Sequence, residues 1–187
     1  HLSRARFEQR PIFKVRRAIP INGNTEVAGL NSIIGEGKFA GIPEGGCTAL
    51  IGRRGAQKSH LAYYFLLQNL SQKKRCLLIT LRDDEYGAIR ILEEIARQEG
   101  FSQLDFSIKP DNHKSVFSED LLTIMYFWPG YLTPQQFLHR IFLSLERGKK
   151  GDMKTGFDLV VLNGIDQLSA RFPLCAAEKM FIPSLLT

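Results

Sequence analysis

Residues 52–59 read Gly52-Arg53-Arg54-Gly55-Ala56-Gln57-Lys58-Ser59. Glycines at this spacing let successive backbone N–H groups converge on phosphate oxygens, while a following lysine pairs with the outer phosphates and a serine hydroxyl can contact Mg²⁺. The two glycines, Lys58 and Ser59 fit these roles. The octet therefore predicts a phosphate-binding turn, or P-loop, that joins a strand to a helix.

One position departs from this pattern, because Gln57 stands where a glycine is expected. A side chain with a Cβ loses roughly 1–2 kcal/mol in a left-handed backbone, which several charge-assisted hydrogen bonds to a triphosphate can outweigh. Arg53 and Arg54 either supply further phosphate-directed charge or face water, and the sequence leaves both open. The alternative for the whole octet is a plain turn whose Lys58 and Ser59 are solvated.

The flanking residues favour the phosphate-binding interpretation. The apolar run Cys47 to Ile51 predicts a buried parallel strand, and Leu61, Tyr64 and Phe65 follow the octet at near-helical spacing. His60 is either a first-turn residue near phosphate or a surface histidine. The predicted nucleotide-binding residues are Gly52, Arg53, Arg54, Gly55, Ala56, Gln57, Lys58, Ser59 and His60.

Two segments upstream carry a family resemblance. Residues 25–35 read TEVAGLNSIIG and residues 41–46 read GIPEGG. Their order before the octet resembles the start of a RecA/KaiC-like ATPase core, where a TG-x-x-G-L-D-x-L-L segment and a GG-I-P-x-G turn precede the P-loop strand. The resemblance covers about residues 15–187. It implies a three-layer α/β/α P-loop core with a mainly parallel sheet, ATP or ADP as the ligand and Mg²⁺ as its metal ion.

The matching catalytic position is altered. In KaiC-like proteins the second core strand ends in two glutamates, one of which activates the attacking water. Residues 80–84 read TLRDD here, so Arg82 and Asp83 occupy that place. Arginine does not deprotonate in proteins, which leaves Asp83 as the candidate catalytic base. Its arm is one methylene shorter than that of glutamate, and a displacement of about 1 Å can lower a rate about 10²-fold.

The strand before the C-terminal segment is altered too. Residues 157–163 read FDLVVLN and resemble a Walker B strand with Asn163 in place of aspartate. Ser59 and Asn163 are therefore the metal candidates, although Asn163 brings no negative charge to the ion. Only 24 residues follow Asn163, whereas the family's sheet continues for at least two more strands. We expect a core truncated after this strand, with self-association or a partner protein completing the sheet.

These departures predict a degenerate RecA/KaiC-like domain that binds ATP or ADP with little or no hydrolysis and has a regulatory or assembly role. The first alternative is an active KaiC-like ATPase that uses Lys58, Ser59 and Asp83 with an unusual metal site. The second is an adaptor that binds nucleic acid through a basic N-terminal arm. The chain is at most a weak ATPase in the leading interpretation.

Composition sets the remaining limits. The chain has 25 basic and 19 acidic residues, a net charge of +6, and residues 1–24 are basic and contain two prolines. We expect an arm or linker over 1–24, with basic residues at Arg4, Arg6, Arg10, Lys14, Arg16 and Arg17, and the core over 25–187. Three widely spaced cysteines predict reduced thiols in a cytoplasmic protein. No apolar run approaches the length of a membrane span.

Local signals predict several further elements. Thr133-Pro134-Gln135-Gln136 is a capping box that predicts a helix from Pro134 to about Arg147, with Phe137, Leu138, Ile141 and Leu145 facing inward. Strands are expected at 76–81 and 158–162, the latter beside the run at 47–51. A helix capped by Asp83 or Asp84 should end at Gly100, with an apolar stripe of Ala88, Ile91, Leu92, Ile95 and Ala96.

Overall fold

The computed structural model describes residues 18–21, 25–34, 41–101, 103–104, 116–117, 121–128, 130–131, 133–147 and 156–171. The chain divides into two compact units, residues 1–49 and residues 50–187. The six arm cations and Cys175 lie outside the described residues. Within those ranges, no helix combines the length and the apolar character that crossing a membrane requires.

The first unit contains a small antiparallel pair and one helix. Strand β1 (Ala18–Ile19) pairs with β2 (Ile42–Pro43), and α1 (Thr25–Ile34) lies between them in sequence. The Asn31 side chain of α1 accepts from the Ile21 N–H at 2.8 Å and donates to the Ile21 carbonyl at 2.7 Å. Residues 18–21, which we assigned to the arm, thus belong to a folded unit.

The second unit is built on a four-stranded sheet in the order β4 (Val116–Phe117), β5 (Leu122–Tyr126), β3 (Cys76–Thr80) and β6 (Leu159–Asn163). Strands β5, β3 and β6 are parallel, and β4 is antiparallel to β5. The register places Thr80 opposite both Tyr126 and Asn163. The carboxyl ends of the three parallel strands therefore meet at one edge.

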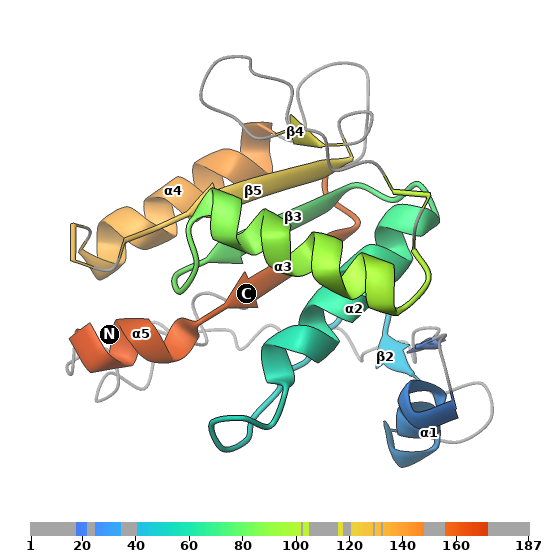
Figure 1. Cartoon of the computed structure of the whole chain (residues 1–187). Helices are drawn as coiled ribbons and strands as arrows, with labels where there is room; N and C mark the ends of the chain where they lie inside the picture. The colour runs from blue at the N-terminus through green and yellow to red at the C-terminus, as the bar shows by residue number, and fades with distance from the viewer. Residues whose placement is uncertain are drawn as a thin grey trace, which may run out of the picture. The chain divides into compact units, whose positions relative to one another are not determined.

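Helices cover both faces of this sheet (Figure 1). Helices α2 (Lys58–Ser71) and α3 (Glu85–Gln98) pack on one face around Leu66, Leu78 and Leu92. Helix α4 (Pro134–Arg147) packs on the other around Phe127 and Phe137, and α5 (Ile165–Arg171) follows β6. The second unit is a mixed α/β structure with a helix layer on each side of a mainly parallel sheet.

The sequence signals for two helices are confirmed. Asp84 caps α3 by accepting from the Gly87 N–H at 2.7 Å. At α4 the Thr133 hydroxyl accepts from the Gln136 N–H at 3.2 Å, and the Gln136 side chain accepts from the Thr133 N–H at 3.0 Å. The inward face predicted for α4 packs against the sheet. On α3 the stripe differs at one position, since Ile91 is partly exposed and Ile89 is buried instead.

The predicted strand at residues 47–51 was wrong. These residues form no strand, and the side chains of Leu50 and Ile51 are 42% and 93% exposed. Among the described strands β6 pairs only with β3, which takes the place predicted for residues 47–51. An apolar run forms a strand only where a neighbour satisfies its backbone N–H and C=O groups, and composition alone does not identify that neighbour.

Replacing Phe137 by alanine should test the packing of α4 on the sheet. Phe137 is 1% exposed and its ring stacks edge-on against Phe127 at 5.3 Å between centroids. Losing a buried phenyl ring should lower the free energy of unfolding by about 3–5 kcal/mol. Phe142→Ala is the matched control on the same helix, because Phe142 is 51% exposed, and it should change stability by about 0.5 kcal/mol or less. Equal effects in urea denaturation would contradict this packing.

Candidate nucleotide-binding site

The glycine octet forms a tight turn that leads directly into α2. The Ala56 N–H donates to the Arg53 carbonyl at 3.3 Å, and Gly55 has a φ of +81°. Gln57 follows with φ 49° and ψ 26°, in the left-handed region, and its carbonyl accepts the first helical hydrogen bond from the Leu61 N–H at 3.0 Å. The backbone therefore adopts the conformation that a glycine would favour, with glutamine in its place.

Lys58 folds back across this turn. Its ammonium group donates to the Gly52 carbonyl at 2.9 Å and to the Arg53 carbonyl at 2.7 Å. An ammonium group has three N–H donors, so these two contacts leave one for a ligand. Lys58 thus holds the loop closed and places a positive charge at its centre.

The N-terminus of α2 lacks the side-chain cap that the N-terminus of α3 has. Gln57 makes no side-chain cap and the first turn of α2 has no acidic residue, whereas α3 has the Asp84 cap and Glu85. The first N–H groups of a helix need outside partners, and the helix dipole favours a negative charge there. Between Glu44 and Asp83 the sequence has no acidic residue at all. Arg53 and Arg54 are exposed beside this N-terminus.

Ser59 and Asn163 are brought together, as the two metal candidates would require. The Ser59 hydroxyl donates to Asn163 Oδ1 at 2.8 Å, although 104 residues separate them. Asn163 Nδ2 in turn donates to the hydroxyl of Tyr63 at 2.8 Å. We did not predict Tyr63 from the sequence. Its only sequence signal is its position four residues after Ser59, which places both side chains on one face of α2.

The turn after β3 belongs to the same edge of the sheet. The Thr80 hydroxyl accepts from the backbone N–H groups of Arg82 at 3.3 Å and of Asp83 at 3.2 Å. The Leu81 N–H donates to the Asn163 carbonyl at 3.0 Å. The Arg82 guanidinium pairs with Asp166 of α5 at 3.2 Å, so the arginine at the expected glutamate position is engaged on the surface.

The candidate base Asp83 lies within electrostatic range of the Tyr63 hydroxyl. Burial is the main cause that raises the pKa of Tyr63 to about 12, and the negative charge of Asp83 adds to the rise. Side-chain hydrogen bonds with Asn163 and Thr80 and the charge of Arg82 act in the opposite direction. Tyr63 therefore stays protonated at neutral pH and can keep its place in the network.

The residues at Ser59 do not fit a Mg²⁺ ion. Magnesium takes oxygen ligands in a near-ideal octahedron and is usually held by one or two carboxylates. Here the oxygen of Asn163 already accepts from Ser59 and its nitrogen faces Tyr63. Throughout the described ranges, no group of three or more His, Cys, Asp or Glu side chains is arranged to hold a metal ion. The charged side chains of the loop, Arg53, Arg54 and Lys58, are all positive, which is the sign of charge that an anion such as phosphate would need.

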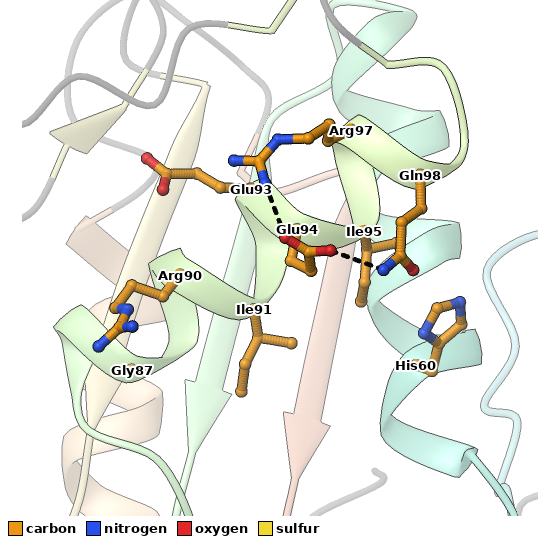
Figure 2. A pocket seen from close by; sticks show the side chains of 9 residues that line it. All are labelled: His60, Gly87, Arg90, Ile91, Glu93, Glu94, Ile95, Arg97 and Gln98. Atoms are coloured by element: carbon orange, nitrogen blue, oxygen red, sulfur yellow. Dashed lines mark hydrogen bonds and ion pairs between the residues drawn. The ribbon is translucent and has the colours of Figure 1, made fainter.

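His60 points to a different surface. Its Nε2 lies 3.7 Å from a Glu99 carboxylate oxygen, and it borders a hollow of about 780 Å³ whose other lining residues all come from α3 (Figure 2). Glu94 in that hollow accepts from Arg97 at 2.9 Å and from Gln98 at 2.7 Å. The hollow contains both acidic and basic side chains, with Glu94 paired to Arg97, and this mixture does not select an anion. The structure thus separates His60 from the loop residues with which we grouped it.

Comparisons with known proteins identify no family for this chain. Neither the family profiles nor the curated proteins include a match to this chain. Any functional assignment therefore depends on the loop, on Lys58 and Ser59, and on the hydrogen bonds around Asn163.

Substitutions at Gln57 should reveal the strain in the loop. Gln57→Gly removes roughly 1–2 kcal/mol of left-handed strain, of which the entropy of the added glycine offsets about 0.5–1 kcal/mol. Stability should therefore rise by up to about 1 kcal/mol, whereas Gln57→Val should lower it because β-branched residues are the least tolerant of positive φ. Lys73, also left-handed with φ 60° at the other end of α2, provides the control: Lys73→Gly should stabilise similarly. A destabilising Gln57→Gly in urea denaturation would contradict the observed loop conformation.

Proposed function

We propose that this chain is a degenerate RecA/KaiC-like nucleotide-binding domain that holds ATP or ADP through its glycine loop and hydrolyses it little or not at all. The loop binds the phosphates, and the protein uses the bound state for regulation or assembly inside a larger protein. The family itself is part of this proposal and comes from the order of the sequence motifs.

The uncapped N-terminus of α2 carries the proposal. There the loop, the Lys58 ammonium and the Ser59 hydroxyl converge at the carboxyl edge of a parallel sheet. This is the edge where open α/β sheets usually bind ligands. A capped helix in the same unit, α3, has its first-turn donor satisfied by Asp84. The contrast supports an anion as the missing partner of α2, and a nucleoside polyphosphate is an anion of the size that a P-loop accepts.

Two positions argue against an efficient ATPase. Arg82 cannot act as a base and pairs with Asp166. Asn163 offers no charge, and its amide is used by Ser59 and Tyr63. Asp83 remains the candidate base of the runner-up ATPase interpretation, because the turn after β3 places it at the same edge of the sheet. The six cations of the basic arm in the nucleic-acid interpretation lie outside the described residues.

The assembly role is supported by the outer edge of β6. Among the described strands only β3 borders β6, and Val160 on this strand is 43% exposed. Unpaired strand edges invite pairing with another chain, so we propose that a second copy or a partner protein completes the sheet. We propose a cytoplasmic location, where thiols stay reduced; Cys47 and Cys76 are not joined in a disulfide.

Removing the Lys58 ammonium should abolish most nucleotide binding. Hydrogen bonds to charged groups contribute about 1.5–3 kcal/mol, so Lys58→Ala should weaken ATP binding at least about tenfold in isothermal titration calorimetry. Lys73→Ala is the matched control, since it removes the same charge from the opposite end of α2 and should leave the affinity unchanged. Equal losses in both variants would point to general charge attraction and contradict a specific loop site.

ATP turnover should be negligible in the wild-type chain. General-base assistance typically contributes about 10²–10⁴-fold, and no glutamate occupies the expected place. The triple variant Gln57→Gly, Arg82→Glu, Asn163→Asp should raise phosphate release measurably, while the single variants should not, because such residues act as a unit. Wild-type turnover near an ordinary enzyme rate of about 1 s⁻¹ would contradict the proposal and favour Asp83 as the base.

A further inference from the structure

The hydrogen bonds around Asn163 form a relay that runs from the half-buried Ser59 to the buried Tyr63. Asn163 is 8% exposed, and Tyr63 and Thr80 are fully buried. Ser59 and Tyr63 approach the same amide from one face of α2, one as donor to its oxygen and the other as acceptor from its nitrogen. A carboxylate cannot take this place unchanged, because it has no N–H to give to Tyr63.

We infer that this site selects a metal-free polyphosphate, and that Tyr63 enforces the selection by fixing the Asn163 amide against Ser59. The inference rests on the proposed function and specifies the form of its ligand. The amide oxygen that faces Ser59 is neutral and already accepts a hydrogen bond. A divalent cation beside Ser59 would have to displace this hydrogen bond, and the neutral amide oxygen would offer it no negative charge.

The charge that a cation normally brings is supplied by the chain. Lys58 lies in the loop, Arg53 and Arg54 are exposed beside it, and no acidic residue occurs from residue 45 to residue 82. Lysine and arginine both pair with phosphate oxygens, and arginine does so through two parallel hydrogen bonds. The uncapped N–H groups of α2 add donors at the same point. A free polyphosphate, with its full negative charge, suits this set better than its magnesium complex.

Tyr63 acts as a positioning residue, since its hydroxyl contacts the Asn163 amide. Without its hydroxyl the Asn163 nitrogen loses its acceptor, and the amide is free to turn away from Ser59. The neighbouring Tyr64 is a matched control: it is also buried on the same helix, but its ring packs edge-on against Phe101.

The test is calorimetric titration of the full chain with sodium ATP, in EDTA and in excess MgCl₂. Wild type should bind at least as tightly in EDTA as in MgCl₂. Asn163→Asp restores a carboxylate beside Ser59 and should shift the ratio of the two affinities at least about tenfold toward MgCl₂. Tyr63→Phe should shift the same ratio several-fold toward MgCl₂ and remove the exchange protection of the Asn163 side-chain amide in NMR spectra, while Tyr64→Phe should change neither.

The possible outcomes distinguish a failure of the inference from a failure of the proposed function. Wild-type binding at least about tenfold tighter in MgCl₂ overturns the inference and leaves the proposed nucleotide site standing. Unchanged Asn163 amide protection in a folded Tyr63→Phe variant overturns the role given to Tyr63. No binding in either buffer overturns the proposed function, and the inference with it.

Discussion

The hydrogen bond from Ser59 to Asn163 is the contact on which the site depends. It joins the first turn of α2 to the last residue of β6 across 104 residues of sequence. Because β3 and β6 are parallel and in register, the same bond aligns the loop with Thr80 and with the turn that carries Asp83. Without it, only the apolar packing of α2 on the sheet would hold the loop at this edge.

The loop contains both a strained backbone conformation and the hydrogen bonds that stabilise it. Gln57 holds a left-handed backbone that a glycine would adopt without penalty, and Lys58 closes the turn by two hydrogen bonds to loop carbonyls. Residues in such conformations persist only where their surroundings determine them, and they gather at ligand sites. The hydrogen bonds of Lys58 hold the loop in this conformation, which would reduce the ordering that the proposed binding requires.

Much of the second unit could be predicted from the sequence, because its signals are local. The capping box at Thr133, the Asp84 cap and the apolar strand at Cys76 each depend on a few neighbouring residues, and each is confirmed. Ser59 and Asn163 were predicted as the metal candidates; they lie in contact, but through a hydrogen bond to each other that does not fit Mg²⁺. The glycine loop also precedes a helix as the octet predicted.

Other features depend on partners that local sequence does not reveal. The run at residues 47–51 looks like a buried strand by composition, yet it lacks a neighbour and stays exposed. Tyr63 looks like an ordinary core aromatic in the sequence. Its hydroxyl accepts a hydrogen bond from Asn163 of β6, which is 100 residues away in the chain. His60 follows Ser59 directly, but the helical turn directs it toward Glu99. The role of the loop as a phosphate site is tested most directly by ¹⁵N-resolved NMR titration with inorganic pyrophosphate in EDTA. The amide signals of Gly55, Gln57, Lys58 and Ser59 should shift together and saturably, while that of Gly87, already bonded to Asp84, stays in place. Saturable shifts confined to α3, or none at all, would contradict the account.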